Sequence, residues 1–453
     1  MNDPNGLVFY DGVYHLFFQY YPDGLTWGPM HWGHATSRDL VHWTELPIAL
    51  YPDALGMIFS GSIVIDRDNT SGLGHNGKAP WVAIFTHHDS LAEKAGSEAY
   101  QHQSIAYSLD DGNSWTKYAG NPVLPNPGMK NFRDPKVFWH TETHRWMMVL
   151  AAGDRMQFYA STDLKTWTLE SELDGFDLAE GNVVECPDLV ALEFEGRKRW
   201  VLIVSLVKGA PNAGSGTRYI VGDFDGRHFV PEHQDIRWLD YGPDNYAGVT
   251  FHNTGEKVLL IGWMSNWSYA QAVPTAPWRS AMTLPRELGL VSVDGKAVLS
   301  QSAPPVFCGP ALMDSDWNAD LSAAWCQSKG ILQLNFGAEN QPSFDLTLSN
   351  DNGERLLIGF DAAEQHYFID RRDSGPNTFS SDFSMRATAP KIDAGQGTEI
   401  TLYFDTCSVE LFAGNGTTVM TSLFFASAAY DCVRLETSEP AKNGRLTVFK
   451  FNR

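Results

Sequence analysis

Apolar and polar residues alternate in short runs along most of the chain, and the runs pair into hairpins. Examples are NGLVFYDGVYHLFFQY (5–20), PKVFWHTETHRWMMVLAA (135–152) and PDLVALEFEGRKRWVLIVS (187–205). Each of these segments has the order apolar strand, polar turn, apolar strand, which is typical of a β-hairpin. Helical periodicity is scarce over the first two thirds of the chain. The pattern therefore predicts an all-β protein.

A second kind of hairpin alternates with the first. Its members share a small residue, an aspartate in the turn and a closing tryptophan, as in ATSRDLVHW (35–43), AYSLDDGNSW (106–115) and YASTDLKTW (159–167), with VGDFDGRHF (221–229) as a looser copy. The two kinds follow each other five times, with a period of about 50 to 75 residues. Four-stranded units repeated around an axis are the blades of a β-propeller. We predict a five-bladed propeller rather than two stacked sandwiches, which would not explain the repeat.

The repeat stops after KAVLSQSAPPVFCGP (296–310). Short alternating strands such as ILQLNFG (331–337), EITLYFD (399–405) and RLTVFKF (445–451) follow, separated by Asn, Asp and Gly turns. This pattern is typical of a β-sandwich. We place the boundary near residue 305, so that 1–305 form a propeller catalytic domain and 306–453 a sandwich domain.

Charge and composition argue against several kinds of ligand and structure. The formal net charge of −21 disfavours nucleic acid and anionic membrane surfaces as partners. No apolar run reaches the roughly 18 residues of a membrane span. No motif indicates a cofactor or a metal. No disulfide framework or zinc signature is present among the five cysteines, Cys186, Cys308, Cys326, Cys407 and Cys432.

The chain opens as MNDPNG, inside what reads as a structured motif, and carries no signal peptide. We expect a leader and some first residues to precede it. The protein would then be secreted or periplasmic if a leader is removed, and cytoplasmic otherwise.

Three acidic residues occur at similar phases of the repeat. Asp3, Asp134 and Glu185 each stand just before or at the start of a first strand, and Ser60 and Tyr246 occupy the corresponding places in the other two blades. A proline follows each acid at once or after one residue, which restricts the backbone to extended geometry. First strands line the central channel of a propeller. We therefore expect the three carboxylates to meet at one mouth of the channel.

Three carboxylates in one site predict acid–base chemistry. Neighbouring like charges raise at least one pKa. We expect Arg133 to keep Asp134 ionised and Glu185, with no adjacent cation in the sequence, to stay protonated as a general acid. Such a pair cleaves glycosidic bonds, and a separation of about 5 to 5.5 Å between Asp3 and Glu185 would indicate a retaining mechanism.

Other motifs receive structural interpretations. His87 and His88, before Asp89, are interpreted as hydrogen-bonding residues at the cleft edge and not as metal ligands, since no third ligand is evident. The segment 90–102 is expected to be the main loop that shapes specificity. The tryptophans that close the repeats are assigned to blade packing: Trp43, Trp115 and Trp167.

The motifs MNDPNG, FSGS, FRDP, ECPDL and GWMSNW…PTAPWRSAMTLPREL resemble glycoside hydrolase family 32, which contains invertases, exo-inulinases and levanases. The resemblance covers essentially the whole chain and implies a five-bladed propeller followed by a sandwich. It implies that Asp3 is the nucleophile, Glu185 the acid/base and Asp134, with Arg133, the transition-state stabiliser. It also implies a fructose pocket lined by Asn2, Gln19, Trp27, Phe59, Ser60, Trp267 and, as a weaker match, Tyr246.

The implied activity is retaining, exo-acting hydrolysis of terminal β-D-fructosyl residues from inulin, levan, fructooligosaccharides or sucrose. The Asp of NDPNG favours exo-acting members of the family. Two alternatives remain open, a fructosyltransferase that uses the same intermediate and a non-catalytic carbohydrate-binding propeller. The expected partner is a small or polymeric β-fructoside. A homodimer through the sandwich domain is an option that no residue pattern favours.

Overall fold

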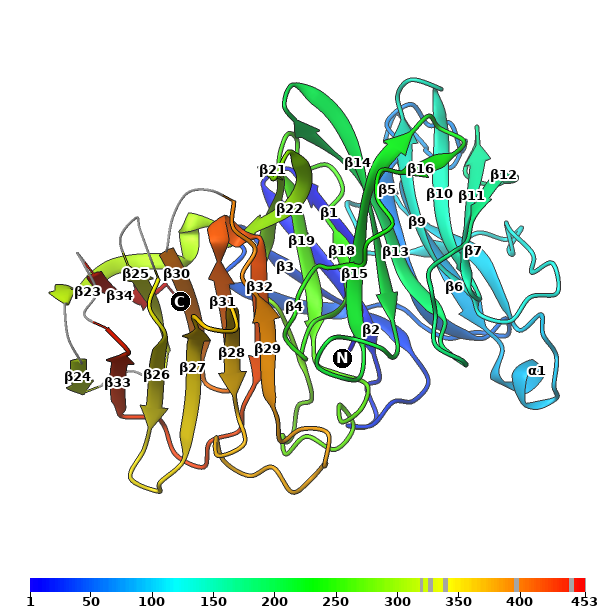
Figure 1. Cartoon of the computed structure of the whole chain (residues 1–453). Coiled ribbons are helices and arrows are strands. Elements are labelled where there is room, and N and C mark those ends of the chain that lie inside the picture. Colours follow the sequence, from blue (N-terminus) through cyan, green and yellow to red (C-terminus); the bar gives the residue numbers. More distant parts are fainter. Residues whose placement is uncertain (318–320, 325–328, 337–340, 395–398, 440–443, 453) are drawn as a thin grey trace.

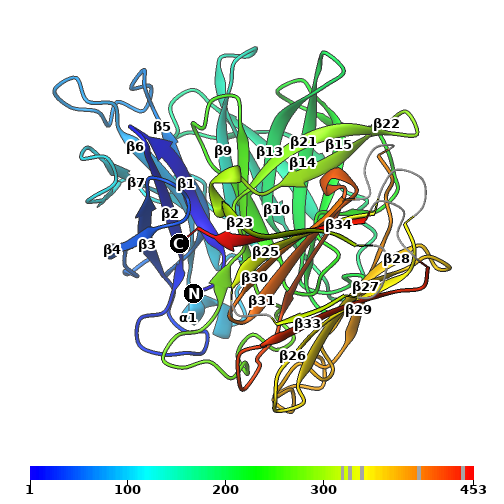
Figure 2. The same cartoon turned by 90° about the vertical axis from the view of Figure 1, so that its left-hand side faces the viewer.

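The structure is a computed structural model that describes residues 1–317, 321–324, 329–336, 341–394, 399–439 and 444–452. Cys326 lies outside these residues. Figure 1 shows two β-rich units side by side, with the early strands in one and β23 onwards in the other. Figure 2 views the molecule from the side of the second unit.

Five antiparallel sheets, each built from strands consecutive in sequence, form the first unit. In each of the first three blades, the four strands follow one another in sequence from the innermost strand to the outermost. They comprise β1 (Pro4–Tyr10), β2 (Val13–Tyr20), β3 (His31–Ser37) and β4 (Trp43–Leu50); β5 (Met57–Ile65), β6 (Trp81–His88), β7 (Gln101–Ser108) and β8 (Thr116–Lys117); and β9 (Phe132–His140), β10 (Arg145–Ala152), β11 (Arg155–Ser161) and β12 (Thr168–Leu173).

The last two blades each carry an additional short strand. They comprise β13 (Val184–Phe194), β14 (Arg197–Leu206), β15 (Gly216–Phe224), β16 (Phe229–Pro231) and β17 (Arg237–Trp238); and β18 (Tyr246–Thr250), β19 (Val258–Met264), β20 (Ala281–Met282), β21 (Arg286–Val293) and β22 (Lys296–Ser302).

The ring closes through backbone hydrogen bonds between β1 and His252, just after β18. Phe9 N donates to His252 O (2.9 Å), and His252 N donates to Leu7 O (2.8 Å). In the centre, the Lys136 ammonium bonds to Asp188 Oδ2 and to Thr250 O, both at 2.8 Å, and so joins three inner strands. The predicted five-bladed propeller is confirmed.

The repeated Asp-containing hairpins form nearly identical turns. In the first, the Ser37 hydroxyl accepts from Leu40 N (2.8 Å), Asp39 Oδ1 accepts from His42 N (2.8 Å), and the Trp43 indole donates to Leu40 O (3.0 Å). Serine and aspartate side chains thus satisfy backbone groups that no strand can pair. The indoles of Trp115 and Trp167 make the same bond in their blades. These tryptophans pack the blades, as predicted.

Buried apolar side chains fill each space between neighbouring blades. One cluster combines Phe17 from the first blade with Phe85 from the second, and another combines Met148 from the third with Val82 from the second. The sheet faces between blades are therefore buried near the centre, and second strands such as β6 and β10 read as continuous apolar runs rather than as alternating ones.

Two six-stranded sheets form the β-sandwich. One has the order β23 (Cys308–Trp317), β34 (Gly444–Phe451), β25 (Gly330–Asn335), β30 (Glu399–Asp405), β31 (Ser408–Ala413) and β32 (Thr418–Leu423). The other has the order β24 (Leu321–Ala324), β33 (Cys432–Thr437), β26 (Phe344–Ser349), β27 (Arg355–Asp361), β28 (His366–Asp370) and β29 (Arg386–Pro390).

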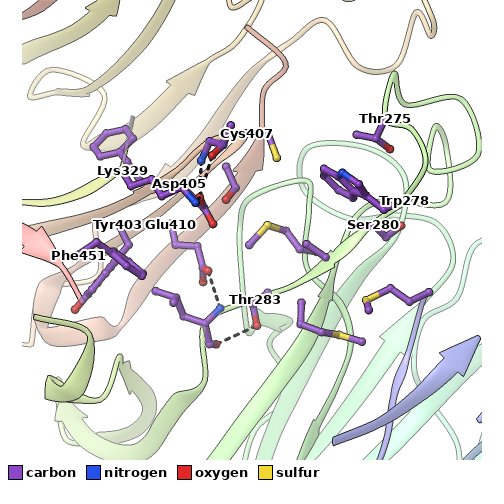
Figure 3. Close-up of a pocket in the computed structure, with 18 of the residues that line it drawn as sticks. Thr275, Trp278, Ser280, Thr283, Lys329, Tyr403, Asp405, Cys407, Glu410 and Phe451 are labelled. Carbon is purple, nitrogen blue, oxygen red and sulfur yellow. Dashed lines mark hydrogen bonds and ion pairs between the residues drawn. The ribbon is translucent and has the colours of Figure 1, made fainter. Parts of the chain in front are cut away.

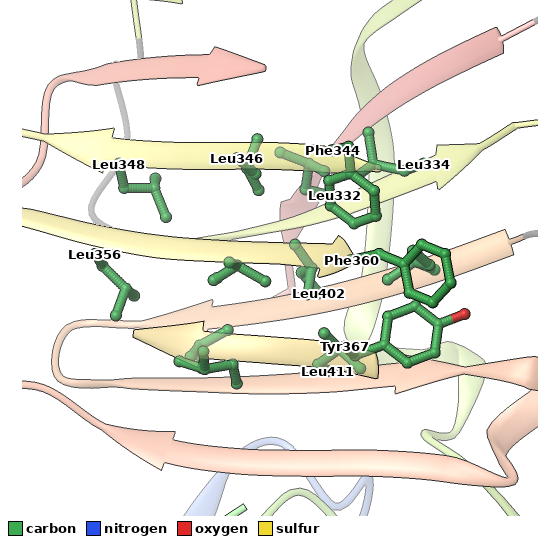
Figure 4. Close-up of a cluster of buried hydrophobic side chains, with 14 of the residues drawn as sticks. Leu332, Leu334, Phe344, Leu346, Leu348, Leu356, Phe360, Tyr367, Leu402 and Leu411 are labelled. Atoms are coloured by element: carbon green, nitrogen blue, oxygen red, sulfur yellow. The ribbon is translucent and has the colours of Figure 1, made fainter. Parts of the chain in front are cut away.

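Alternate residues of the facing strands make the core of the sandwich. Figure 4 shows this core, which includes Leu332, Leu334, Phe344, Leu346, Leu348, Leu356, Phe360, Tyr367, Leu402 and Leu411. Alternation along the chain predicted the sandwich, and the structure confirms it. Since β22 ends at Ser302 and β23 begins at Cys308, with the 3-10 helix η1 (Pro305–Phe307) between them, we propose a domain boundary near residue 305.

Buried ion pairs join the sandwich to the propeller. Arg286 on β21 is fully buried, and its guanidinium bonds to Asp240 Oδ2 (2.9 Å) and to Glu410 Oε2 (2.7 Å) on β31. Arg371 bonds in the same way to Asp244 Oδ2 (2.6 Å). Buried charges of this kind require partners in fixed places, so they fix how the two domains are oriented.

The loop between β6 and β7 contains the short helix α1 (Ser90–Lys94), which the strand pattern did not predict. Asp89 caps the helix, because its Oδ1 accepts from Leu91 N (2.9 Å) and Ala92 N (3.0 Å). The 3-10 helix η2 (Gly414–Gly416) connects β31 and β32. Within the described ranges, we find no helix with the length and apolar character to cross a membrane.

Candidate active site

The backbone before β1 is held against β2. Asn2 N donates to Gln19 O, and Gln19 N donates to Asp3 O, each at 3.0 Å. These two bonds extend the β1–β2 ladder beyond Pro4. Asp3 therefore sits on ordered backbone although it is the third residue of the sequence.

A β-bulge interrupts the inner strand of each of the last three blades at the same place. The first bulged residue has positive φ in each case: 64° at Asp134, 45° at Cys186 and 53° at Ala247. This backbone conformation is energetically unfavourable for a residue with a side chain, and conformations of this kind cluster at functional sites. The residues that the bulges follow are Arg133, Glu185 and Tyr246.

Asp3 is held from three sides. The Ser60 hydroxyl donates to its Oδ2 (2.7 Å), Asn2 Nδ2 donates to its Oδ1 (3.1 Å), and the Cys186 thiol lies 3.6 Å from Oδ2. Burial raises the pKa of Asp3, and the bond from Ser60 opposes this shift. Ser60 lies within the bulge of β5, further along its strand than we expected.

Asp134 lies on the other side of the same thiol. Cys186 N donates to Asp134 Oδ2 (3.0 Å), the Cys186 thiol lies 3.6 Å from that oxygen, and Asp134 N donates to Thr86 Oγ1 (3.0 Å). Burial raises the pKa of Asp134 to about 7; Arg133 opposes this shift, and the Glu185 carboxylate contributes to it. Cys186 thus bridges Asp3 and Asp134.

The guanidinium of Arg133 lies closer to Glu185 than to Asp134. Its Nη2 lies 2.5 Å from Glu185 Oε1, while its Nε lies 3.8 Å from Asp134 Oδ2. The expectation that Glu185 has no cation beside it is wrong, and Arg133 only partly offsets the burial that raises the pKa of Asp134. The reason is that the arginine side chain crosses to the neighbouring blade, which adjacency in sequence does not reveal.

Tyr246 lies behind the pocket wall rather than in it. The side chain is fully buried, and its hydroxyl donates a short hydrogen bond to Glu185 Oε2. Burial raises the pKa of this phenol well above 10. Tyr246 is thus a proton-bearing partner of Glu185. The expectation that it lines the fructose pocket does not fit its position, because its side chain is fully buried and reaches the site only through Glu185.

A pocket of about 280 Å³ opens over these groups. Asp3, Asp134 and Glu185 all line it, as do the predicted residues Asn2, Gln19, Trp27, Phe59, Ser60, Arg133 and Trp267. The Gln19 side chain is buried, and its Nε2 has no partner among the described residues. A buried amide donor without a partner is costly, so a polar ligand is expected to complete its hydrogen bonding.

Five further residues line the pocket: His88, Glu93, Tyr100, Gln101 and Asn131. Of these, His88 was expected at the cleft edge, and the sequence pattern did not single out the other four. Four of the five residues flank or belong to the loop that was expected to shape specificity. His87, in contrast, is turned away and bonds to Ser104 Oγ (2.7 Å) and to Asp53 (3.3 Å). A histidine pair at consecutive strand positions points to opposite faces, and this alternation was the available signal.

A larger cavity of about 920 Å³ lies between the domains (Figure 3). It is mainly apolar and is bordered by Trp278, Lys329, Tyr403, Asp405 and Glu410. None of the three site acids lines it. Volume alone therefore does not locate the chemistry, and the smaller acidic pocket is the candidate active site.

Comparison with known sequences assigns both domains. Residues 1–302 match the Glycosyl hydrolases family 32 N-terminal domain, and residues 317–450 match the Glycosyl hydrolases family 32 C terminal domain. A levanase of Bacillus subtilis (strain 168) is 44% identical over 442 residues, covering 93% of this chain but 64% of the levanase. The chain thus spans less than two thirds of that relative. The extracellular exo-inulinase inuE of Aspergillus niger is 40% identical over 472 residues, covering 94% of this chain and 87% of the inulinase.

Solved structures agree over the whole chain. The exo-inulinase of Aspergillus awamori superposes with a TM-score of 0.92 at 36% identity, covering 100% of this chain and 96% of the other. A β-fructofuranosidase of Schwanniomyces occidentalis complexed with fructosyl-erythritol superposes with a TM-score of 0.88 at 32% identity, covering 100% and 95%.

A propeller with a carboxylate-lined pocket at its channel mouth, joined rigidly to a sandwich, defines a class of glycoside hydrolases. The chain belongs to glycosyl hydrolase family 32.

Proposed function

We propose that the protein is an exo-acting β-fructosidase that releases terminal β-D-fructosyl units from fructans, fructooligosaccharides or sucrose with retention of configuration. The observation that carries the proposal is the convergence of Asp3, Asp134 and Glu185 on one pocket. Two features support it. The Gln19 amide offers an unused buried donor to a polar ligand, and the levanase and exo-inulinase relatives cover almost all of this chain.

Asp3 acts as the nucleophile in the proposed reaction. Its carboxylate oxygen forms a bond to the anomeric carbon of the fructosyl unit while the bond from that carbon to the leaving oxygen breaks. Ser60 and Asn2 donate to the carboxylate, so they stabilise the ionised form that attack requires and hold it in place.

Glu185 acts as the acid and then as the base. It gives a proton to the leaving oxygen, and in the second step it takes a proton from the water that displaces Asp3 from the anomeric carbon. Arg133 and Tyr246 both donate to Glu185 and stabilise its carboxylate, the form needed in the second step. The proton that Glu185 takes from water in the second step restores the protonated acid for the next turnover, so the cycle balances without another donor.

Asp134 binds the fructosyl ring in this scheme. Its carboxylate is buried, held by Cys186 N, and faces the pocket, so it is positioned to accept hydrogen bonds from sugar hydroxyls. Bonds of this kind that shorten in the transition state lower the barrier directly.

Substitution of the two acids tests the assignment. We expect Asp3→Asn and Glu185→Gln each to lower kcat for fructose release by about 10³-fold or more, because each removes one of the two reacting carboxyl groups. Thermal unfolding of both variants should match the parent. Glu193→Gln, on an exposed position of β13, is the matched control and should keep full activity. Turnover near the parent level in either variant would remove its assigned role.

Products identify the substrate and the reaction type. Sucrose, inulin and levan are incubated with the protein, and the products are separated by chromatography. Free fructose without longer oligosaccharides, accompanied by an equal amount of glucose when the substrate is sucrose, supports hydrolysis, whereas longer oligosaccharides indicate transfer to a sugar acceptor. NMR of the first product should show the β-anomer, because two displacements retain the configuration.

A further inference from the structure

A chain of side chains leads from the catalytic ion pair to the rim of the pocket. Arg133 Nη1 donates to Gln101 Oε1 (3.4 Å), Gln101 Nε2 donates to His88 Nδ1 (3.2 Å), and His88 Nε2 lies 3.1 Å from Glu93 Oε2 on α1. The bond from Gln101 places the imidazole proton on Nε2, so His88 donates to Glu93 while it is neutral. Burial lowers the pKa of His88, which agrees with the neutral form.

The histidine at the centre of this chain is fixed in orientation. The Phe59 ring stacks on it at 4.3 Å with an interplanar angle of 8°, and Tyr100 packs edge-on at 5.4 Å. Trp27 in turn packs edge-on against Phe59 at 6.0 Å. Glu93 therefore has a defined position at the rim, held from one side by His88 and from the other by the cap of α1 at Asp89.

Glu93 presents an available carboxylate oxygen to the pocket. It lines the pocket, and its side chain is 48% exposed. Oε2 is engaged by His88, and across the described ranges no hydrogen bond or ion pair involves Oε1. A carboxylate oxygen at the mouth of a sugar pocket is suited to accept hydrogen bonds from hydroxyl groups.

The place of Glu93 relative to Glu185 indicates which sugar it would meet. The leaving oxygen must come within hydrogen-bond reach of Glu185, while the fructosyl ring lies against Asp3 and the buried Asp134. The leaving sugar then extends from Glu185 toward the rim, past the buried side chains of Gln101 and His88 to the exposed carboxylate of Glu93.

We propose that Glu93 forms the binding site for the leaving sugar, accepts hydrogen bonds from its hydroxyls and so determines specificity for the leaving group. His88 acts as a positioning residue that holds the Glu93 carboxylate. This inference rests on the proposed β-fructosidase function and names its leaving-group site. The required ligand chemistry is a polyhydroxylated leaving group, such as a glucosyl or a second fructosyl unit.

Two substrates with the same fructosyl unit separate this role from a general one. Sucrose has a sugar as its leaving group, and 4-nitrophenyl β-D-fructofuranoside has an aromatic leaving group without hydroxyls. We expect Glu93→Gln and Glu93→Ala to raise KM for sucrose by about tenfold or more, with kcat within about threefold, because hydrogen bonds to a charged group are lost. For the aryl fructoside, kcat/KM should stay within about twofold.

Glu98→Gln is the matched control. Glu98 lies on the same loop, is similarly exposed and pairs with Lys130 at 3.4 Å outside the pocket, so its substitution should change neither substrate. An equal loss on both substrates in the Glu93 variants would overturn the proposal, because it would show that Glu93 only supports the pocket. Unchanged kinetics on both would also overturn it. A parent protein that turns over neither substrate would instead contradict the proposed function.

Discussion

At the scale of single residues, the site holds more carboxylates than positively charged partners. Three carboxylates converge, and among the described residues that line the pocket a single guanidinium, that of Arg133, pairs with Glu185. Asp3 has hydroxyl, amide and thiol partners, whereas Asp134 has amide and thiol partners and lies 3.8 Å from the same guanidinium. Burial without a full countercharge raises the pKa of both acids. The stability and the activity of this protein therefore depend on the protonation of individual carboxyl groups, and so on pH.

The raised pKa of Asp134 makes a prediction about stability. Its pKa is about 7 in the folded protein, against an ordinary value of 3.8 for an aspartate in an unfolded chain. The folded state binds the proton more tightly, so the contribution of Asp134 to stability is complete below about pH 4 and is lost as pH rises to about 7. We expect Asp134→Asn to weaken this loss. Urea unfolding of both proteins at about pH 5 and about pH 8 measures it, and the same pH dependence in parent and variant would contradict the assignment.

At the scale of the element, the inner strands decide where the site residues point. The bulges at Asp134, Cys186 and Ala247 break the ladder once in each blade, just where a functional side chain is presented. A regular strand would alternate its side chains between the two faces and could not present two neighbouring residues to the pocket. In the second blade the bulge contains Ser60 and is followed by Gly61.

Gly61 allows two strands to approach closely beside the site. A Cβ at this position would lie 2.1 Å from Ile84 O on β6. We expect Gly61→Ala to destabilise the protein by about 3 kcal/mol, since backbone must move to relieve the overlap, and to lower activity because Ser60 moves with it.

Gly248→Ala is the control for this prediction. Gly248 lies in the bulge of the fifth blade, and the atoms nearest to its added Cβ would belong to the Leu260 side chain, at 3.3 Å and beyond. We expect it to cost about 1 kcal/mol or less. Equal unfolding free energies for the two variants, measured with urea, would show that the close approach of the two strands at Gly61 does not contribute to stability as predicted.

At the scale of the whole molecule, the sandwich is attached to the propeller by buried charges. Gly242 lies against the backbone of Thr421, where an added Cβ would lie 2.1 Å from its carbonyl oxygen, and Tyr241 N donates to Val419 O (2.8 Å). The segment before β18 therefore runs along β32 of the sandwich. Because β18 belongs to the blade that carries Tyr246, the sandwich helps to hold one side of the active site.

Arg286 tests the energetic weight of this attachment. We expect Arg286→Met to lower the free energy of unfolding by about 3 to 5 kcal/mol, because Asp240 and Glu410 would remain buried without their cation. Arg355→Met, which breaks the exposed pair with Asp373, is the control and should cost less than about 1 kcal/mol. Thermal unfolding measures both, and a similar small shift for the two would contradict the structural role of Arg286.

Much of the architecture followed from patterns that are local in sequence. Strand, turn and strand repeat with a fixed signature of serine, aspartate and tryptophan, and each signature folds through contacts within a few residues, as at Ser37, Asp39 and Trp43. The number of blades, the change to a sandwich and the phase of the three acids depend on such local signals. The short helix α1 was not predicted, because its five residues are too few to show a helical period of hydrophobic positions.

Repetition along the chain was enough to establish which carboxylates face one another, because equivalent strands of a repeat occupy equivalent places around an axis. The distribution of charge among them became visible only in three dimensions. Arg133 pairs most closely with Glu185 on the next blade and not with Asp134, its neighbour in the chain. The Tyr246 hydroxyl contacts Glu185 from outside the pocket. Glu93, on the short helix α1, lines the pocket. Side-chain partners across blades are set by packing, and electrostatic energy depends on distance in space and on burial, neither of which is written in the order of residues.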